Sequence, residues 1–104
     1  MNAHDVYWIT DPGHAWLAVD VRKYPDAVDY GTGFGYRGVD WIYLEEDCEA
    51  PAFLMDHPEL DSKGMFVQDY PRTDAIVRFM PKNEDRLDYD AYMARRRAMR
   101  EVSA

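Results

Sequence analysis

Two apolar segments separated by a short turn constrain the fold of this chain more than any other part of its sequence. Residues 5–10 (DVYWIT) and 15–21 (AWLAVDV) are rich in aromatic and β-branched side chains, which favour extended strands. The sequence DPGH between them supplies the proline and glycine of a tight reversal. This pattern predicts a β-hairpin.

The chain after the hairpin predicts more strands. Residues 22–33 show no sustained period, so we expect a loop there, with at most one helical turn in YPDAVDY. Two short strands are expected within residues 34–46, around Gly38. GMFVQDY (64–70) and AIVRF (75–79) read as two further strands, separated by PRTD.

Two helices are expected, one in the middle of the chain and one near its C-terminus. A stripe spaced by four, four and three residues predicts an amphipathic helix that ends before Pro58, and the stripe is Leu44, Cys48, Ala52 and Met55. We expect its N-cap near Asp47, Cys48 or Glu49. Residues 84–103 begin with acids and end with arginines, as the helix dipole prefers. Their predicted apolar side is Leu87, Ala91, Ala94 and Ala98. The sequence therefore predicts an α+β fold, a small antiparallel sheet packed with these two helices.

Composition bounds the domain organisation. A chain of 104 residues with 47% hydrophobic content supplies one core, so we expect a single domain over residues 1–104. It has no run of eighteen apolar residues and no secretory signal pattern, which favours a soluble cytoplasmic protein. A single cysteine excludes an internal disulfide and any paired CxxC zinc motif.

Negative charge is concentrated in the middle of the sequence. Twenty acidic and twelve basic residues give a net charge of −8, and residues 40–61 contain eight acids without any Lys or Arg. Such a segment repels nucleic acid and attracts basic surfaces. The basic run RRRAMR (95–100) is interpreted as a helix end or as a partner of the acidic body rather than as a nucleic-acid patch.

The glycines of GTGFGYRG match the GxGxxG spacing of dinucleotide sites. Such a site also needs a preceding strand, a helix that starts at the glycines and a surrounding βαβ unit, none of which is evident here. We therefore interpret Gly33, Gly35 and Gly38 as glycines of a bent or bulged strand.

Cys48 raises the question of an enzyme. Paired with His14 or His57 as the base, and with Asp11 or Glu49 as the group that orients the histidine, it would resemble a hydrolase nucleophile. Its place on the apolar stripe is more typical of a small buried side chain, and neighbouring carboxylates would disfavour the thiolate.

A dedicated metal site is not expected. The sequence offers oxygen ligands at Glu45, Glu46, Asp47 and Glu49, but it lacks the spacing of an EF-hand loop. We expect neither a metal nor a cofactor.

The acidic segment could instead imitate nucleic acid. Carboxylates at alternate strand positions lie about 7 Å apart, and those one helical turn apart about 6 Å, close to the spacing of successive phosphates. An ordinary solvated face remains the alternative. The residues predicted to bind a partner are Asp40, Tyr43, Glu45, Glu46, Asp47, Glu49, Phe53, Asp56 and Glu59.

At ITDPGHAWLAV and YLEEDCEAPAFL the chain resembles a group of small proteins carried by bacteriophages and other mobile elements. In that group a DPGHGWL-like segment precedes a YLEEDCDA-like segment. The resemblance covers roughly the first 55 residues and departs at Ala15, where the group has glycine. It supplies no catalytic residues.

The resemblance implies a cellular context, the cytoplasm of a host bacterium. Small acidic phage proteins often block host defences whose basic surfaces hold nucleic acid, as anti-CRISPR and anti-restriction proteins do. We therefore expect a non-enzymatic inhibitor that binds the basic surface of a CRISPR effector or restriction enzyme and contacts neither nucleic acid nor a membrane. The alternatives are a small hydrolase or metal-dependent enzyme using His14 and Cys48, and an accessory module that binds a protein through its aromatic-rich sheet.

Overall fold

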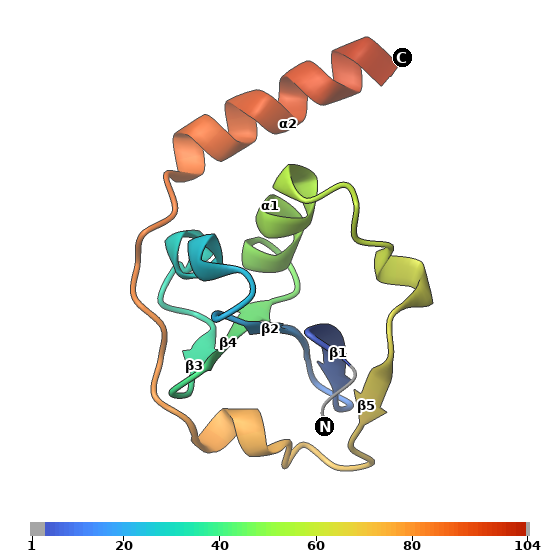
Figure 1. The fold of residues 1–104 in the computed structure, drawn as a ribbon, viewed down its shortest axis with the longest axis vertical. Coiled ribbons are helices and arrows are strands. Elements are labelled where there is room, and N and C mark those ends of the chain that lie inside the picture. The colour runs from blue at the N-terminus through green and yellow to red at the C-terminus, as the bar shows by residue number, and fades with distance from the viewer. Residues whose placement is uncertain (1–3, 104) are drawn as a thin grey trace.

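The computed structural model describes residues 4–103. Within them the chain forms the strands β1 (Val6–Thr10), β2 (Ala15–Asp20), β3 (Tyr36–Arg37), β4 (Trp41–Glu45) and β5 (Val67–Asp69). The α-helices are α1 (Glu49–Asp56) and α2 (Tyr89–Ser103), and the 3-10 helices are η1 (Pro25–Tyr30), η2 (Ser62–Gly64) and η3 (Ile76–Phe79) (Figure 1). The predicted α+β class is confirmed.

The strands form one sheet in the order β3-β4-β2-β1-β5. The predicted hairpin is confirmed, since β1 pairs antiparallel with β2, and β4 pairs antiparallel with both β2 and β3. The sheet is nevertheless mixed, because β5 runs parallel to β1, with Trp8 opposite Val67. A parallel neighbour requires a long crossover, and here the chain passes through the rest of the sheet and α1 before it returns beside β1.

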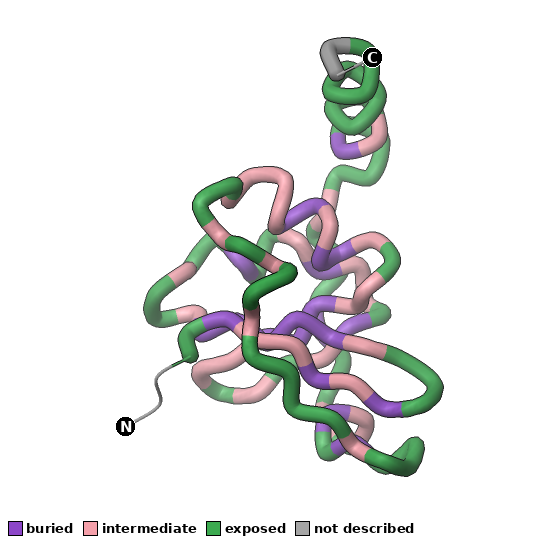
Figure 2. Tube along the Cα trace, turned by 90° about the vertical axis from the view of Figure 1, so that its right-hand side faces the viewer, coloured by how far each residue is buried: buried purple, intermediate pink, exposed green. Residues whose placement is uncertain are grey.

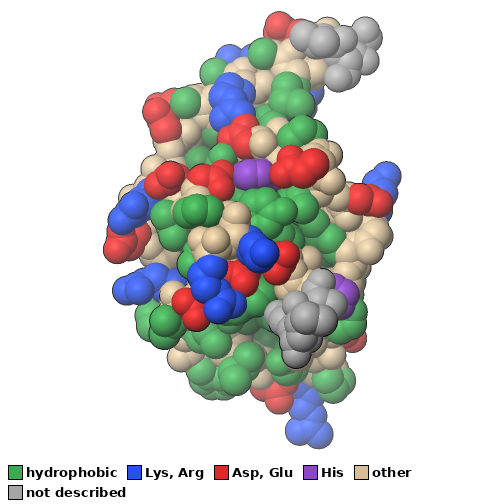
Figure 3. Space-filling model, in the orientation of Figure 1, with side chains coloured by type: hydrophobic (Ala, Val, Ile, Leu, Met, Phe, Trp, Pro, Cys, Tyr) green, Lys and Arg blue, Asp and Glu red, His purple; other side chains and the backbone are tan. Residues whose placement is uncertain are grey.

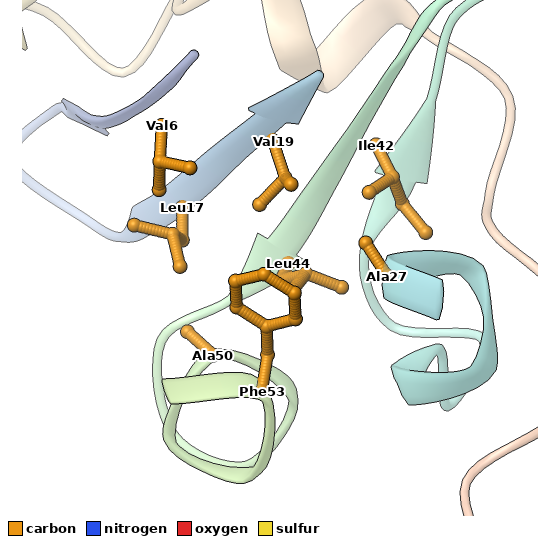
Figure 4. Close-up of a cluster of buried hydrophobic side chains, with 8 residues drawn as sticks. All are labelled: Val6, Leu17, Val19, Ala27, Ile42, Leu44, Ala50 and Phe53. Atoms are coloured by element: carbon orange, nitrogen blue, oxygen red, sulfur yellow. The ribbon is translucent and has the colours of Figure 1, made fainter. Parts of the chain in front are cut away.

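One face of the sheet carries the aliphatic core. Leu17 lies between Trp8 and Leu44 in the strand register, so these side chains share one face. Figure 4 shows Phe53 of α1 pointing from its helix onto this face. Phe53 and Leu17 are both fully buried, and burying a side chain of this size stabilises the fold by about 2 kcal/mol.

The opposite face is aromatic, and the chain after β5 covers it. Ile9 and Trp16 are buried here against Ala75 and Val77. The predicted strand in AIVRF (75–79) is wrong, because this segment forms the 3-10 helix η3. Its backbone makes local hydrogen bonds and lays Val77 on the sheet, so it adds no strand to the ladder.

The start of α1 agrees with the prediction, since Cys48 is its N-cap and the helix begins at Glu49. Leu44, the first member of the predicted stripe, belongs instead to β4, where it pairs with Leu17. The second helix begins later than predicted. α2 starts at Tyr89 and buries Tyr92, whereas the rest of the helix extends away from the body (Figures 1 and 2). The predicted apolar side of α2 is therefore wrong over Ala91, Ala94 and Ala98, which are exposed because the body ends beneath the first turns of the helix.

The GxGxxG segment opens no helix. Gly33 has a φ of +87°, a backbone conformation that other residues rarely adopt, and β3 follows it. At Gly35 a Cβ atom would collide with Glu49 and with the backbone of Tyr43. These glycines serve a turn and a close packing contact, as the bent-strand interpretation predicted.

None of the helices within residues 4–103 is sufficiently long and apolar to span a bilayer.

Candidate functional site

A cleft of about 630 Å³ lies beside the aromatic face of the sheet. It is bounded by the start of β2 and the end of β4, which lie side by side in the sheet, by the turn before α1 and by the chain that leads into α2. Its lining combines aromatic rings, two cations and three carboxylates, a mixture that can bind an amphipathic ligand. The lining residues are His14, Trp16, Thr32, Phe34, Tyr36, Glu45, Asp47, Cys48, Arg78, Lys82, Asp85, Leu87 and Tyr89.

Two cation–π pairs form one wall of the cleft. The guanidinium carbon of Arg78 lies 5.2 Å from the ring centroid of Trp16, and Lys82 Nζ lies 4.1 Å from that of Tyr36. The two rings meet edge to face, with centroids 6.2 Å apart. This arrangement fixes the position of the aromatic wall.

Arg78 is held in place by Asp11, a residue of the hairpin turn. Arg78 Nε lies 2.6 Å from Asp11 Oδ2, and Arg78 Nη2 lies 2.7 Å from Asp11 Oδ1. The Asp11 carboxylate is fully buried and also accepts hydrogen bonds from the backbone N–H groups of Gly13 and His14. The hydrogen bonds from Arg78 hold the pKa of Asp11 well below its ordinary value, against the opposing effect of burial.

Three consecutive acids, Glu45, Glu46 and Asp47, form what we call the acidic rim. Glu45 and Asp47 line the cleft, and Glu46 lies between them in the sequence. Glu45 accepts a hydrogen bond from the backbone N–H of Asp47, and Asp47 is exposed. Burial, together with the nearby carboxylates of Asp47 and Glu49, raises the pKa of Glu45. No Lys, Arg or His of the described residues forms an ion pair with any member of the acidic rim.

Three other acids of the segment 40–61 do have cationic partners. Asp40 lies 3.7 Å from Arg22, and Asp56 pairs with Arg95 of α2. Glu59 Oε2 lies 3.1 Å from His57 Nδ1. Figure 3 shows acidic and basic side chains intermixed on one face of the molecule rather than one continuous acidic row. Within residues 40–61, the acids that form no ion pair among the described residues are the acidic rim, the buried Glu49 and Asp61. The acidic rim is therefore the run of consecutive unpaired carboxylates in this segment.

The prediction that Glu49 is a surface carboxylate is wrong. Its side chain is fully buried and binds four residues. Its Oε2 accepts hydrogen bonds from Thr32 N at 2.6 Å, Thr32 Oγ1 at 2.5 Å and Gly35 N at 3.2 Å. Its Oε1 accepts from Glu45 N at 2.9 Å and Asn83 Nδ2 at 3.0 Å. Five donors satisfy the carboxylate, so Glu49 joins the loop before β3, the end of β4 and the 81–88 segment.

Two predicted aromatic anchors are also buried. Phe53 has no exposed surface because it packs onto the sheet with Tyr24 and Tyr30 at its edges. Tyr43 is 9% exposed and lies in the aromatic core. The prediction of exposed anchors at these positions is wrong, since Phe53 points from α1 onto one face of the sheet and Tyr43 lies on the opposite face, which the chain after β5 covers.

Cys48 and His14 line the same cleft. Cys48 is the N-cap residue of α1, and His14 is the exposed residue just before β2. No hydrogen bond joins the two side chains within residues 4–103. Burial, followed by the charges of Glu45 and Glu49, raises the pKa of the Cys48 thiol, which disfavours the thiolate.

His57, the other histidine considered as a base, lies in a separate network. Its Nε2 is 2.7 Å from Asp26 Oδ2, so it links η1 to the end of α1, while its ring stacks on Phe53 at a centroid distance of 4.2 Å. Burial opposes ionisation, but the hydrogen bonds to Asp26 and Glu59 outweigh it and raise the pKa of His57. His57 does not line the cleft that holds Cys48.

Sequence reasoning missed Arg78, Lys82 and Asn83 as parts of this region. Arg78 lies 67 positions from Asp11, and Asn83 lies 34 positions from Glu49, so no local pattern connects them. One local signal was present in the DPGH turn. An aspartate at the start of such a turn commonly accepts hydrogen bonds from backbone N–H groups that follow it, as Asp11 does from Gly13, and this predicts a fixed carboxylate at that position.

No family model, curated protein or solved structure matches this chain. The described part of the chain also contains no group of three or more His, Cys, Asp or Glu side chains arranged to hold a metal ion.

Proposed function

We propose that this protein acts by binding, as an acidic, non-enzymatic inhibitor of a host complex whose working surface is basic. The observation that carries the proposal is the acidic rim. Its three carboxylates are adjacent in the sequence and have no cationic partner among the described residues, whereas Asp40, Asp56 and Glu59 do.

Uncompensated charge of this kind favours a cationic partner for a physical reason. Like charges held close together repel, and part of Glu45 is already removed from water, so an incoming cation gains from each carboxylate. The net charge of −8 adds a long-range attraction that accelerates encounter and weakens with salt. We therefore expect the partner to contact the acidic rim and not the whole segment 40–61.

The resemblance to small proteins of bacteriophages supports a target among host defences. A CRISPR effector or a restriction enzyme holds nucleic acid in a channel lined by arginine and lysine, and three neighbouring carboxylates can occupy part of such a channel in place of phosphates. Glu49, Phe53 and Tyr43 have no role in this contact because they are buried.

The test is a pull-down from a host lysate at low and high salt, with the recovered proteins identified by mass spectrometry. The variant Glu46→Lys/Asp47→Lys should lose a CRISPR effector or restriction enzyme that the wild type recovers at low salt. A matched variant, Asp74→Lys/Glu101→Lys, changes the net charge equally at exposed positions outside the cleft and should still recover it. Equal loss in both variants would mean that overall charge, and not the acidic rim, drives binding.

A second candidate function is a small hydrolase, favoured by one observation. His14 and Cys48 line the same cleft, which brings a possible base and a possible nucleophile to one site. Turnover of ester or amide substrates that Cys48→Ala and His14→Ala both abolish would support it. Slow alkylation of Cys48 by iodoacetamide at neutral pH, unchanged by His14→Ala, would contradict it.

A further inference from the structure

The charges that line the cleft select the kind of ligand it can hold. Glu45, Asp47 and Asp85 contribute three carboxylates, while Arg78 and Lys82 contribute two cations. Arg78 is paired with Asp11, whereas Lys82 and the three carboxylates form no ion pair within the described residues, so three unpaired carboxylates face one unpaired cation. The balance therefore favours a cationic ligand.

Arg78 has little capacity left for an anion. Two of its nitrogens bind the buried carboxylate of Asp11, and its guanidinium carbon lies over the ring of Trp16. That pair is electrically neutral. An anion in the cleft would gain little from Arg78 and would approach the unpaired carboxylates of Glu45 and Asp47.

Lys82 has contacts inside the protein but no ion pair among the described residues. Its Nζ donates a hydrogen bond to the backbone oxygen of Phe34 at 3.2 Å and lies over the ring of Tyr36. These contacts hold Lys82 against the aromatic wall, and the unpaired carboxylates of the cleft still outnumber its one charge.

Exposed aromatic rings distinguish between two kinds of cation. Phe34 is 70% exposed and Tyr89 is 54% exposed, and both line the cleft. A planar guanidinium can stack on such rings while its N–H groups reach carboxylates, whereas an ammonium is more strongly hydrated and does not stack. The volume of about 630 Å³ is enough for one long side chain and its backbone.

We infer that this cleft binds an arginine side chain of a basic partner protein, with Glu45 and Asp47 contacting the guanidinium and Phe34 and Tyr89 flanking its plane. This rests on the proposed function and deepens it, because it assigns the partner a single inserted arginine. Rim charge alone would accept any basic surface, whereas the cleft selects arginine over lysine.

The test is an NMR titration of ¹⁵N-labelled protein with N-acetyl-arginine amide, N-acetyl-lysine amide and N-acetyl-glutamine amide. The arginine compound should shift amide resonances of the residues that line the cleft and should bind at least about fivefold more tightly than the lysine compound. The glutamine compound should cause no saturable shift. Equal binding of all three, or shifts confined to other surfaces, would overturn the inference.

Two pairs of variants separate the carboxylates from the rings. Glu45→Gln/Asp47→Asn should weaken arginine binding at least about fivefold, while Asp74→Asn/Glu101→Gln should leave it within about twofold. Phe34→Ala should reduce the preference for arginine over lysine. Phe79→Ala removes a ring of similar exposure, 78%, outside the cleft, and should leave that preference unchanged.

Other outcomes distinguish this inference from the function on which it rests. If the pull-down depends on the acidic rim but arginine amide does not bind, the proposed function stands and the arginine site is wrong. Saturable shifts of the cleft resonances when the protein alone is concentrated would assign the cleft to the exposed arginines of α2 from a second copy, and would overturn the choice of a partner protein.

Discussion

Arg78 donates two hydrogen bonds to the carboxylate of Asp11, from Nε to Oδ2 at 2.6 Å and from Nη2 to Oδ1 at 2.7 Å, and this contact connects η3 to the hairpin turn. Asp11→Asn should lower the free energy of unfolding by about 2 kcal/mol at pH 7, because the charge-assisted hydrogen bonds weaken and the buried site keeps its donors. Chemical denaturation monitored by tryptophan fluorescence measures this.

The pH dependence of the same pair provides its control. The pKa of Asp11 is lowered on folding, so its contribution is fully present above about pH 4, the unfolded value, and is lost as the pH falls through the folded pKa. The difference in stability between wild type and Asp11→Asn should therefore shrink below about pH 4. A difference that stays constant down to pH 2 would contradict the ion pair.

Glu49 is a buried structural anion whose five hydrogen-bond donors come from three separate segments. Glu49→Gln turns one acceptor oxygen into an N–H₂ group that faces donors, so it should cost about 3 kcal/mol of unfolding free energy. Its neighbour Glu46→Gln should change stability by less than about 0.5 kcal/mol. Thermal melts of the two variants measure the contrast, and similar melting temperatures would mean that the Glu49 network contributes little.

His57 makes the stability of the fold pH-dependent near neutrality. Its pKa is raised on folding, so the contribution is complete below the unfolded value of about 6.5 and is lost as the pH rises through the folded pKa. We expect the unfolding free energy to decline over that interval in the wild type and to be flatter in His57→Gln. NMR titration of the imidazole resonances should give a pKa above 6.5, and a lower value would remove the basis of this prediction.

α2 contributes to stability mainly through one residue. Tyr92 is 4% exposed, whereas residues 94–101 are all exposed. Among them, Arg95 forms an ion pair with Asp56. A chain shortened to residue 93 should lose no more than about 1 kcal/mol, since exposed ion pairs contribute little. Tyr92→Ala in the full chain should lose about 3 kcal/mol. The reverse order of these two losses, measured by urea denaturation, would show that the distal helix is the stabilising part.

Gly35 and Gly38 can be compared to test whether close packing before β4 requires a glycine. A Cβ at Gly35 would collide with Glu49, Asn83 and the backbone of Tyr43, while the nearest atom to a Cβ at Gly38 is 3.9 Å away. Gly35→Ala should therefore lower the free energy of unfolding by about 3 kcal/mol, and Gly38→Ala should be close to neutral. Equal effects in circular dichroism melts would mean that backbone freedom, not the close contact, explains both glycines.

Local patterns were sufficient for some elements. The hairpin, the two strands around Gly38, the strand in GMFVQDY and the existence of both α-helices follow from short-range periodicity and turn residues. Leu44 shows where this approach fails. Its spacing to Cys48 fits a helix, but pairing with Leu17 across the sheet keeps it in β4. Pairing with a strand that is distant in the sequence decides the structure of Leu44, although the helical spacing of apolar residues extends back to it.

The sequence by itself determined the α+β class, the excess of acid and the presence of carboxylates beside Cys48. Only the tertiary structure decided which of those acids are available. Glu49 became a buried structural anion because Thr32, Gly35 and Asn83 bring donors from distant segments, while Glu45 and Asp47 remained beside a cleft whose cations are already engaged. The sequence shows which side chains are acidic, but the burial and the hydrogen-bond partners of each carboxylate depend on long-range contacts that no local pattern encodes.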